Sequence, residues 1–211
     1  MPPKSRGLLI AFFVSIAAVG SYFAYRGHPE LEPTGERAEA ETAEWLRIVR
    51  EQGKAGYWIV VRGTHPGDQV VAAASNARLT HAAVLDADRQ EVIEAVGPGV
   101  RVMPLRALLA ESVRFQLVEP RGYSPERGAA ALARARSHVG APYDWFGTVG
   151  VQNDSSYYCS ELCADAYNAR EEGWMPRIVL HPERLAEFGR VVHDSGMRRS
   201  RYPELPHVDA L

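Results

Sequence analysis

The sequence predicts a mixed fold of helices and strands in which the strands pair antiparallel. Two apolar runs of strand type, residues 80–86 and 91–96, lie so close together that a hairpin must join them. Segments with one apolar side at helical spacing stand before and after this hairpin, at residues 36–53 and 125–139. The 211 residues are enough for one globular domain with a core and extensions.

Charge and cysteine content exclude several classes of protein. The net charge of −2 indicates no basic surface of the kind that binds nucleic acid, so we expect no nucleic-acid partner. Two cysteines cannot make a disulfide framework, and Cys159 and Cys163 stand four residues apart on one predicted helix. No histidine or carboxylate accompanies them at a recognisable metal-ligand spacing. We therefore expect no disulfide, no metal site and no cofactor.

The N-terminal segment, residues 1–27, predicts a membrane anchor or a secretory signal. Lys4 and Arg6 precede a run over residues 7–25 that contains no charged side chain and is long enough to cross one bilayer. By the positive-inside rule, we expect a single-pass helix in a bacterial inner membrane, with the rest of the chain in the periplasm. Small residues at 18–20 leave cleavage and secretion open as the alternative.

Residues 28–56 predict an acidic linker followed by a helix. The helix begins near Glu36, has one apolar side and ends at Gly53. Residues 57–61 form a continuous apolar run and predict a strand. After a loop, the alanine-rich residues 69–75 predict a short helix, because alanine favours helix over strand.

The predicted hairpin brings two polar side chains together. If its turn is centred on residues 87–88, His81 lies directly opposite Glu94. Side chains opposite each other in an antiparallel pair have Cβ atoms about 4.5–5.5 Å apart, so the carboxylate can hold the imidazole as in a catalytic triad. A surface His–Glu pair is the alternative. A register slip of one residue would place the two side chains on opposite faces of the sheet.

The second half of the sequence predicts further strands and helices. A turn with two large aromatic residues, 140–145, leads towards a helix that begins near Cys159. Residues 198–211 are polar and predict a loose tail. The other expected elements are strands at 100–103, 113–118 and 188–193, and helices at 104–111, at 125–139 with Ser124 as its cap, and from Pro182.

Cys159 falls in the first turn of its predicted helix. A short polar side chain at Asp154, Ser155 or Ser156 is expected to cap that helix. The exposed N–H groups and the helix dipole favour an anion there, so the thiol loses its proton more easily and becomes a nucleophile. The alternative is burial, because Cys159 and Cys163 continue one apolar stripe, and position alone favours it.

Several short motifs resemble the YiiX/YaeF-type proteins, which are circularly permuted, papain-like relatives of the NlpC cell-wall hydrolases. The most specific motif is Tyr-Cys-Ser-Glu-Leu at residues 158–162, and the supporting one is His81 followed by Glu94 on paired strands. The resemblance covers about residues 57–192. It also includes Thr80 before the histidine, residues 92–95, residues 99–101 with Pro104 and Leu105, and Gly140 with residues 142–144.

The resemblance implies an α+β, permuted papain-like (NlpC-like) fold over residues 57–197, in which the helix carrying the cysteine packs on an antiparallel sheet. It implies Cys159 as nucleophile, His81 as base and Glu94 as the group that orients it. The backbone N–H of Cys159 would meet the oxyanion, helped by the Tyr143 hydroxyl. Position alone favours a buried, structural Cys159. Because three separate segments each supply a required residue in the required order, the resemblance favours the catalytic role instead.

Three functions follow from these expectations. The first is a cysteine amidase or peptidase that cuts cell-wall peptides or similar amides. The second keeps the triad but acts on lipids, as an acyltransferase or thioesterase near the membrane to which the N-terminal helix would bind. The third is an inactive domain that binds a ligand, which the intact Cys, His and Glu set argues against. Fold analogy alone does not choose between the first two substrates.

Overall fold

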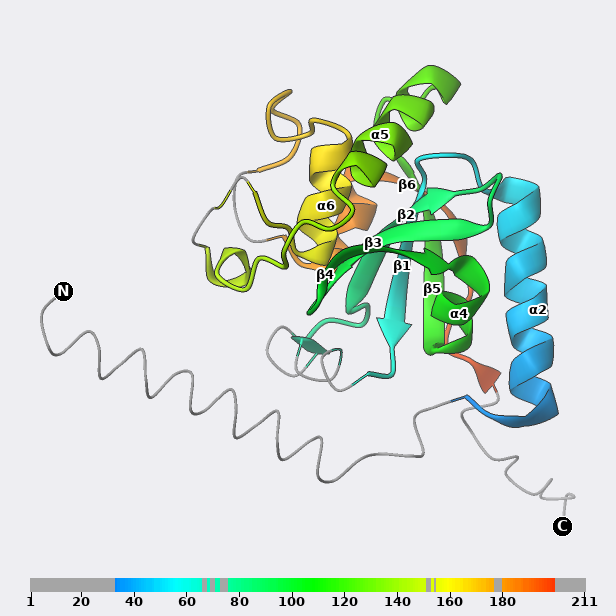
Figure 1. Cartoon of the computed structure of the whole chain (residues 1–211). Helices are drawn as coiled ribbons and strands as arrows, with labels where there is room; N and C mark the ends of the chain where they lie inside the picture. The colour runs from blue at the N-terminus through cyan, green and yellow to red at the C-terminus, as the bar shows by residue number, and fades with distance from the viewer. Residues whose placement is uncertain are drawn as a thin grey trace, which may run out of the picture.

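An antiparallel sheet of six strands lies between two layers of helices in the computed structural model of the chain (Figure 1). The structure describes residues 33–65, 68, 71–72, 76–150, 153, 155–176 and 180–199. The strand order is β4-β3-β2-β1-β5-β6, and each neighbouring pair is antiparallel. The predicted combination of helices with an antiparallel sheet is therefore confirmed.

The elements follow the sequence prediction closely. The strands are β1 (Trp58–Gly63), β2 (His81–Asp86), β3 (Glu91–Val96), β4 (Gly99–Pro104), β5 (Ser112–Pro120) and β6 (Gly189–Asp194). The helices are α2 (Gly35–Gln52), α4 (Leu105–Ala110), α5 (Pro125–Ser137) and α6 (Cys159–Ala166), with 3-10 turns η2 (Gly147–Val149) and η3 (Pro182–Phe188). Ser124 caps α5 as expected, since its hydroxyl oxygen accepts a hydrogen bond from the backbone N–H of Arg127.

The register of the β2–β3 hairpin differs from the prediction. Its turn contains four residues, 87–90, rather than two, and Gln90 has a positive φ of 54°. Glu94 therefore pairs directly with Ala83 and not with His81. The predicted opposition was wrong by two residues, but a two-residue shift preserves the face of a strand, so His81 and Glu94 still lie on one face as diagonal neighbours.

Two buried clusters of apolar side chains hold the sheet to its helices. On one face, side chains of α5, α6 and η3 pack against β1, β2 and β3, and Leu162 and Cys163 of α6 belong to this cluster. On the other face, α2 and α4 pack against the sheet through Trp45, Val49 and their neighbours. The helix predicted within residues 28–56 is thus α2, and it is packed on the sheet.

The guanidinium of Arg198 ties the end of the described chain to α2 and the sheet. Its side chain is fully buried and donates hydrogen bonds to the carbonyl oxygens of Ser112, Ala38 and Leu109 and to the Thr42 hydroxyl. It also lies over the ring of Trp45, 4.1 Å from the centroid. The predicted loose tail therefore does not begin at Arg198.

Two predicted elements lie wholly or mostly outside the residues that the structure describes. The membrane-spanning segment over residues 7–25 lies outside the described residues, and within the described ranges no helix is long and apolar enough to span a bilayer. The predicted helix at 69–75 lies mostly outside them as well. Asp68, Val71 and Ala72 are described and helical.

We expect Arg198→Met to destabilise the fold. The methionine keeps much of the side-chain volume but leaves buried carbonyl oxygens without donors, which costs about 3 kcal/mol. Urea unfolding followed by circular dichroism measures the change. Arg199→Met is the matched control, because Arg199 is exposed and bonds to Glu41 through its backbone N–H. Equal midpoints for the two variants would show that the buried guanidinium does not stabilise the fold.

Candidate active site

Cys159 is the first residue of α6, in agreement with its predicted place at the helix start. Its side chain is buried, with the residue 7% exposed, and it is a free thiol. The expected caps were wrong, because the helix begins later than the polar residues and Tyr158 holds the N-cap position. The free N–H groups of the first turn of α6 therefore lie beside the thiol.

The imidazole of His81 joins Cys159 to Glu94. Its Nε2 atom lies 2.7 Å from Oε2 of Glu94, and the ring lies near enough to the Cys159 side chain for that group to raise the His81 pKa. Since Glu94 occupies Nε2, the ring nitrogen left for Cys159 is Nδ1. The three residues that the sequence predicted to act together are thus brought together, across β2, β3 and the start of α6.

The surroundings of His81 favour its protonated form. Burial by itself lowers the pKa of this imidazole, because a charged ring loses its hydration. The hydrogen bonds to Cys159 and Glu94 and the negative charges of both groups outweigh burial, so the His81 pKa lies well above its ordinary value. The ring can therefore hold a proton that leaves the thiol.

Glu94 has a second partner that the sequence prediction missed. Arg101 of β4 donates from Nε to Oε1 of Glu94 at 2.8 Å, while the Glu94 side chain is only 1% exposed. Burial raises the Glu94 pKa, but the hydrogen bonds and charges of His81 and then Arg101 lower it below its ordinary value overall. The signal was available, since Glu94 and Arg101 stand opposite each other across the short turn at residues 97–98.

A buried polar network supports the start of α6. Glu161 accepts a hydrogen bond from Arg170 at 2.5 Å and lies 3.5 Å from the backbone nitrogen of Tyr158. The Tyr158 hydroxyl accepts hydrogen bonds from Arg170 and from the backbone N–H of Leu180. The Ser160 hydroxyl donates to the Leu180 carbonyl oxygen. The partners Arg170 and Leu180 both follow α6 in the chain, and their contacts hold the start of the helix in place.

Tyr143, the residue predicted to help bind the oxyanion, lies near enough to Cys159 for the charge of that group to act on it. Its backbone forms a parallel bridge with Tyr157, two residues before Cys159, and its ring contacts that of Trp145 at 4.7 Å between centroids. Burial raises the pKa of Tyr143, and the negative charge of a Cys159 thiolate raises it further. Tyr143 therefore keeps its hydroxyl proton and can donate it in a hydrogen bond.

Cys163 occupies the core, as the sequence prediction for this second cysteine requires. It lies one turn after Cys159, is fully buried and belongs to the apolar cluster beneath α6. Burial raises the Cys163 pKa well above its ordinary value, and the charge of Cys159 adds to this effect. The two thiols of one helix therefore have different environments.

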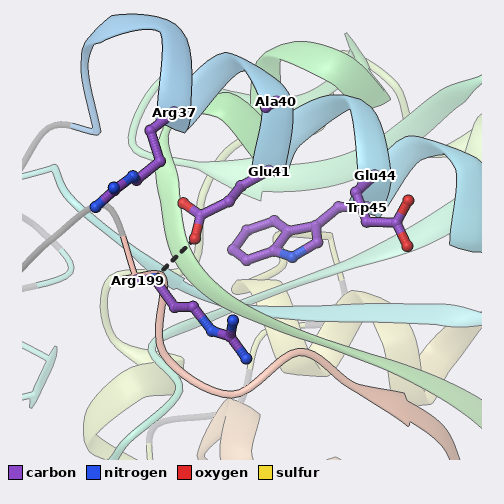
Figure 2. Close-up of a pocket in the computed structure, with 6 residues that line it drawn as sticks. All are labelled: Arg37, Ala40, Glu41, Glu44, Trp45 and Arg199. Atoms are coloured by element: carbon purple, nitrogen blue, oxygen red, sulfur yellow. Dashed lines mark hydrogen bonds between the residues drawn. The ribbon is translucent and has the colours of Figure 1, made fainter.

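A surface groove lies along α2, away from these residues. Figure 2 shows its lining residues, which come from α2 except for Arg199 near the end of the described chain. None of them contributes to the contacts of Cys159, His81 or Glu94. In the described ranges, no group of three or more His, Cys, Asp or Glu side chains has the arrangement of a metal site.

Comparison with known proteins connects these residues to a family. The family described as "Permuted papain-like amidase enzyme, YaeF/YiiX, C92 family" matches residues 64–187, a stretch that includes Cys159, His81, Glu94 and Tyr143. Among solved structures, the chain is similar to the metalloprotein yiiX from Escherichia coli O157:H7, with 25% identity and a TM-score of 0.47. That match covers 55% of this chain and 65% of the other, so it spans less than two thirds of that protein. No curated protein matches the chain.

We expect His81 to remain protonated at pH values where an ordinary histidine is neutral. Because its pKa is raised in the folded protein, the stability that it contributes is complete below about pH 6.5 and is lost as the pH rises through the folded-state pKa. NMR titration of the imidazole nitrogens measures this pKa. Glu94→Gln should lower it, because a negative charge beside the ring is lost.

The matched control for that titration is Glu119→Gln. Glu119 also accepts a hydrogen bond from an arginine on a neighbouring strand, Arg190, but it belongs to β5 and does not contact His81. The control should leave the His81 titration unchanged. An unchanged titration in Glu94→Gln as well would show that the hydrogen bond to Glu94 does not set the protonation of His81.

Proposed function

The chain belongs to the family of permuted papain-like amidases of the YaeF/YiiX type, and on that premise we propose that it cuts amide bonds with a Cys159–His81–Glu94 triad. Its family makes it a papain-like cysteine hydrolase of the amidase and peptidase class. The observation that carries the assignment of the triad is the imidazole of His81, which is hydrogen-bonded to a buried carboxylate and lies beside the Cys159 thiol, whose charge raises its pKa. A nucleophile, a base and an orienting group in contact are the arrangement that nucleophilic catalysis needs.

The proposed reaction has two steps. His81 takes the thiol proton, and the Cys159 sulfur attacks the carbonyl carbon of the amide, giving a tetrahedral intermediate. The imidazolium then gives its proton to the leaving nitrogen, the C–N bond breaks, and a thioester remains on Cys159. In the second step His81 takes a proton from water, the resulting hydroxide attacks the thioester, and the acid leaves as the thiol is restored.

The negative oxygen of each intermediate needs hydrogen-bond donors. We propose the backbone N–H of Cys159 as one donor, because the first N–H groups of a helix have no partner within that helix. The Tyr143 hydroxyl is the second. Its raised pKa, caused first by burial, keeps the proton that such a hydrogen bond requires. Glu94 holds the imidazole in place during both steps.

Cell-wall peptides or related amides are the substrate that we propose. An acyl lipid, cut by the same triad in a thioesterase or acyltransferase reaction, is the second candidate. Trp145 supports it, because this ring is 63% exposed and contacts Tyr143 beside the thiol. An exposed aromatic ring at the site gives an apolar chain a surface to bind.

We further propose that the apolar segment over residues 7–25 attaches the enzyme to the bacterial inner membrane and leaves the catalytic domain in the periplasm. The basic residues before the segment and its length support this placement. Secretion after cleavage of the segment is the alternative. Either location gives the catalytic domain access to the cell wall.

We expect Cys159 to react with iodoacetamide near neutral pH much faster than Cys163. Only Cys159 has a base in contact, and Cys163 is fully buried with a raised pKa caused first by burial. Peptide mapping by mass spectrometry gives both rates. His81→Ala should reduce the Cys159 rate by a factor of about 10² or more.

Cys163→Ala is the matched control for this labelling, because it removes the other thiol of the same helix and should leave the rate of Cys159 unchanged. Slow, equal labelling of the two cysteines would contradict the enzyme mechanism. Full reactivity of Cys159 in His81→Ala would remove His81 from it.

Hydrolysis assays should separate the two substrate classes. The chain is incubated with peptidoglycan fragments and, in parallel, with phospholipid vesicles, and mass spectrometry follows the loss of amide or acyl bonds. We expect new carboxylates and amines from the peptidoglycan fragments, and none with Cys159→Ala. Release of fatty acid from the vesicles alone would favour the lipid substrate and contradict the proposed one.

A further inference from the structure

Both oxygens of the buried Glu94 carboxylate are engaged by cationic side chains. His81 occupies Oε2, and Arg101 occupies Oε1, with its Nε and its Nη2 each 2.8 Å away. The carboxylate has almost no access to water, since its side chain is 1% exposed, whereas the Arg101 side chain is 50% exposed. Arg101 therefore supplies at Oε1 the hydrogen bonds that water would otherwise provide.

Arg101 reaches Glu94 because the β3–β4 hairpin fixes both residues. They are direct partners in the register of this hairpin, so their side chains leave the sheet side by side on one face. The contact does not depend on a loop. The Nη2 atom of Arg101 also lies 3.7 Å from the Met103 sulfur, two residues along the same strand and therefore on the same face.

A buried carboxylate can stabilise an imidazolium only while it is ionised. Burial favours the neutral acid, and the positive charges of His81 and Arg101 favour the carboxylate. Without Arg101, Glu94 would have His81 as its only cationic partner, and a proton on Glu94 would remove the charge that supports the imidazolium. The carboxyl group could also turn, because Oε1 would have no donor.

We propose that Arg101 is a positioning residue that holds Glu94 ionised and turned towards His81. It touches neither Cys159 nor the reacting atoms, and it acts through Glu94. The inference rests on the proposed function and extends the triad by one residue. As a consequence, the reactive state, in which His81 holds the proton of the Cys159 thiol, would persist over a wider pH range.

The other charged groups around this cluster belong to separate contacts. Asp86 and Glu91 stand at the loop end of the β2–β3 hairpin, where both accept hydrogen bonds from Arg136. From α6, Cys159 faces His81, and from the turn before it Tyr143 faces Cys159. On α4, Arg106 bonds to Glu39 of α2. The cations that contact Glu94 in the described ranges are His81 and Arg101.

The test compares the pH dependence of Cys159 alkylation in four versions of the full chain. Wild type, Arg101→Met, Arg101→Lys and Arg190→Met are treated with iodoacetamide between pH 4.5 and 8.5, and peptide mapping gives the rate for Cys159. Arg190→Met is the matched control, because Arg190 and Glu119 are likewise direct strand partners joined by a hydrogen bond, on β6 and β5.

We expect Arg101→Met to react about tenfold more slowly than wild type at pH 5 and within about twofold of it at pH 7.5. Arg101→Lys keeps the positive charge and should restore most of the rate at pH 5. Arg190→Met should follow the wild-type curve. A curve for Arg101→Met that matches wild type overturns the proposal, and so does an equal loss at every pH in both Arg101 variants, which would indicate a purely structural role.

A second measurement keeps this inference separate from the proposed function. ¹³C NMR follows the carboxyl carbon of Glu94 and does not depend on a reactive Cys159. Arg101→Met should move the Glu94 titration to higher pH, and Arg101→Gln provides a second neutral variant if the methionine variant does not fold. An unchanged titration overturns the role of Arg101. Slow alkylation of Cys159 in the wild-type chain, by contrast, counts against the proposed function alone.

Discussion

The hydrogen bond between His81 and Glu94 is the interaction on which the proposed chemistry depends. It joins two neighbouring strands at the place where the start of α6 brings a thiol to the same imidazole. Both side chains are withdrawn from water, so each needs the other, and a missing partner would leave a buried charge uncompensated. The antiparallel register of β2 and β3 fixes this contact, and the β3–β4 hairpin adds Arg101 behind it.

The rest of the structure holds these two strands and one helix in place. Leu162 and Cys163 of α6 pack into the apolar core between this helix and the sheet. The ion pair of Glu161 with Arg170 holds the polar start of the helix. On the opposite face, α2 covers the sheet, and the buried Arg198 fastens the chain after β6 to it. The position of the thiol is thus set from the core and from segments distant in sequence.

Local patterns in the sequence were sufficient for most elements, whereas the proposed roles of Cys159, His81 and Glu94 came from the resemblance to a known family. Strands β2 and β3, the cap of α5 and the place of Cys159 at its helix start all follow from residue type and spacing. The length of the turn at residues 87–90 could not be predicted, because Gln90 adopts a positive φ that its residue type does not indicate. The prediction of a shared face survived because the error was an even number of residues.

Contacts between distant segments were beyond what local patterns can predict. Arg198 is polar and follows the last strand, so it was assigned to a tail, yet it is buried against carbonyl groups contributed by α2, α4 and β5. The contact of Arg170 with Tyr158 and Glu161 likewise joins residues nine or more positions apart. Arg101 was predictable in principle, because it needed only the register across residues 97–98.

The most direct test of the triad is to trap the acyl-enzyme. The chain is mixed with p-nitrophenyl acetate, the reaction is stopped with acid within seconds, and intact-mass measurement with peptide mapping locates any acetyl group. The mechanism predicts one acetyl group per chain, on Cys159, and almost none on that residue when His81 is replaced by alanine. Acetylation of Cys163, or of Cys159 at the same rate without His81, would contradict it.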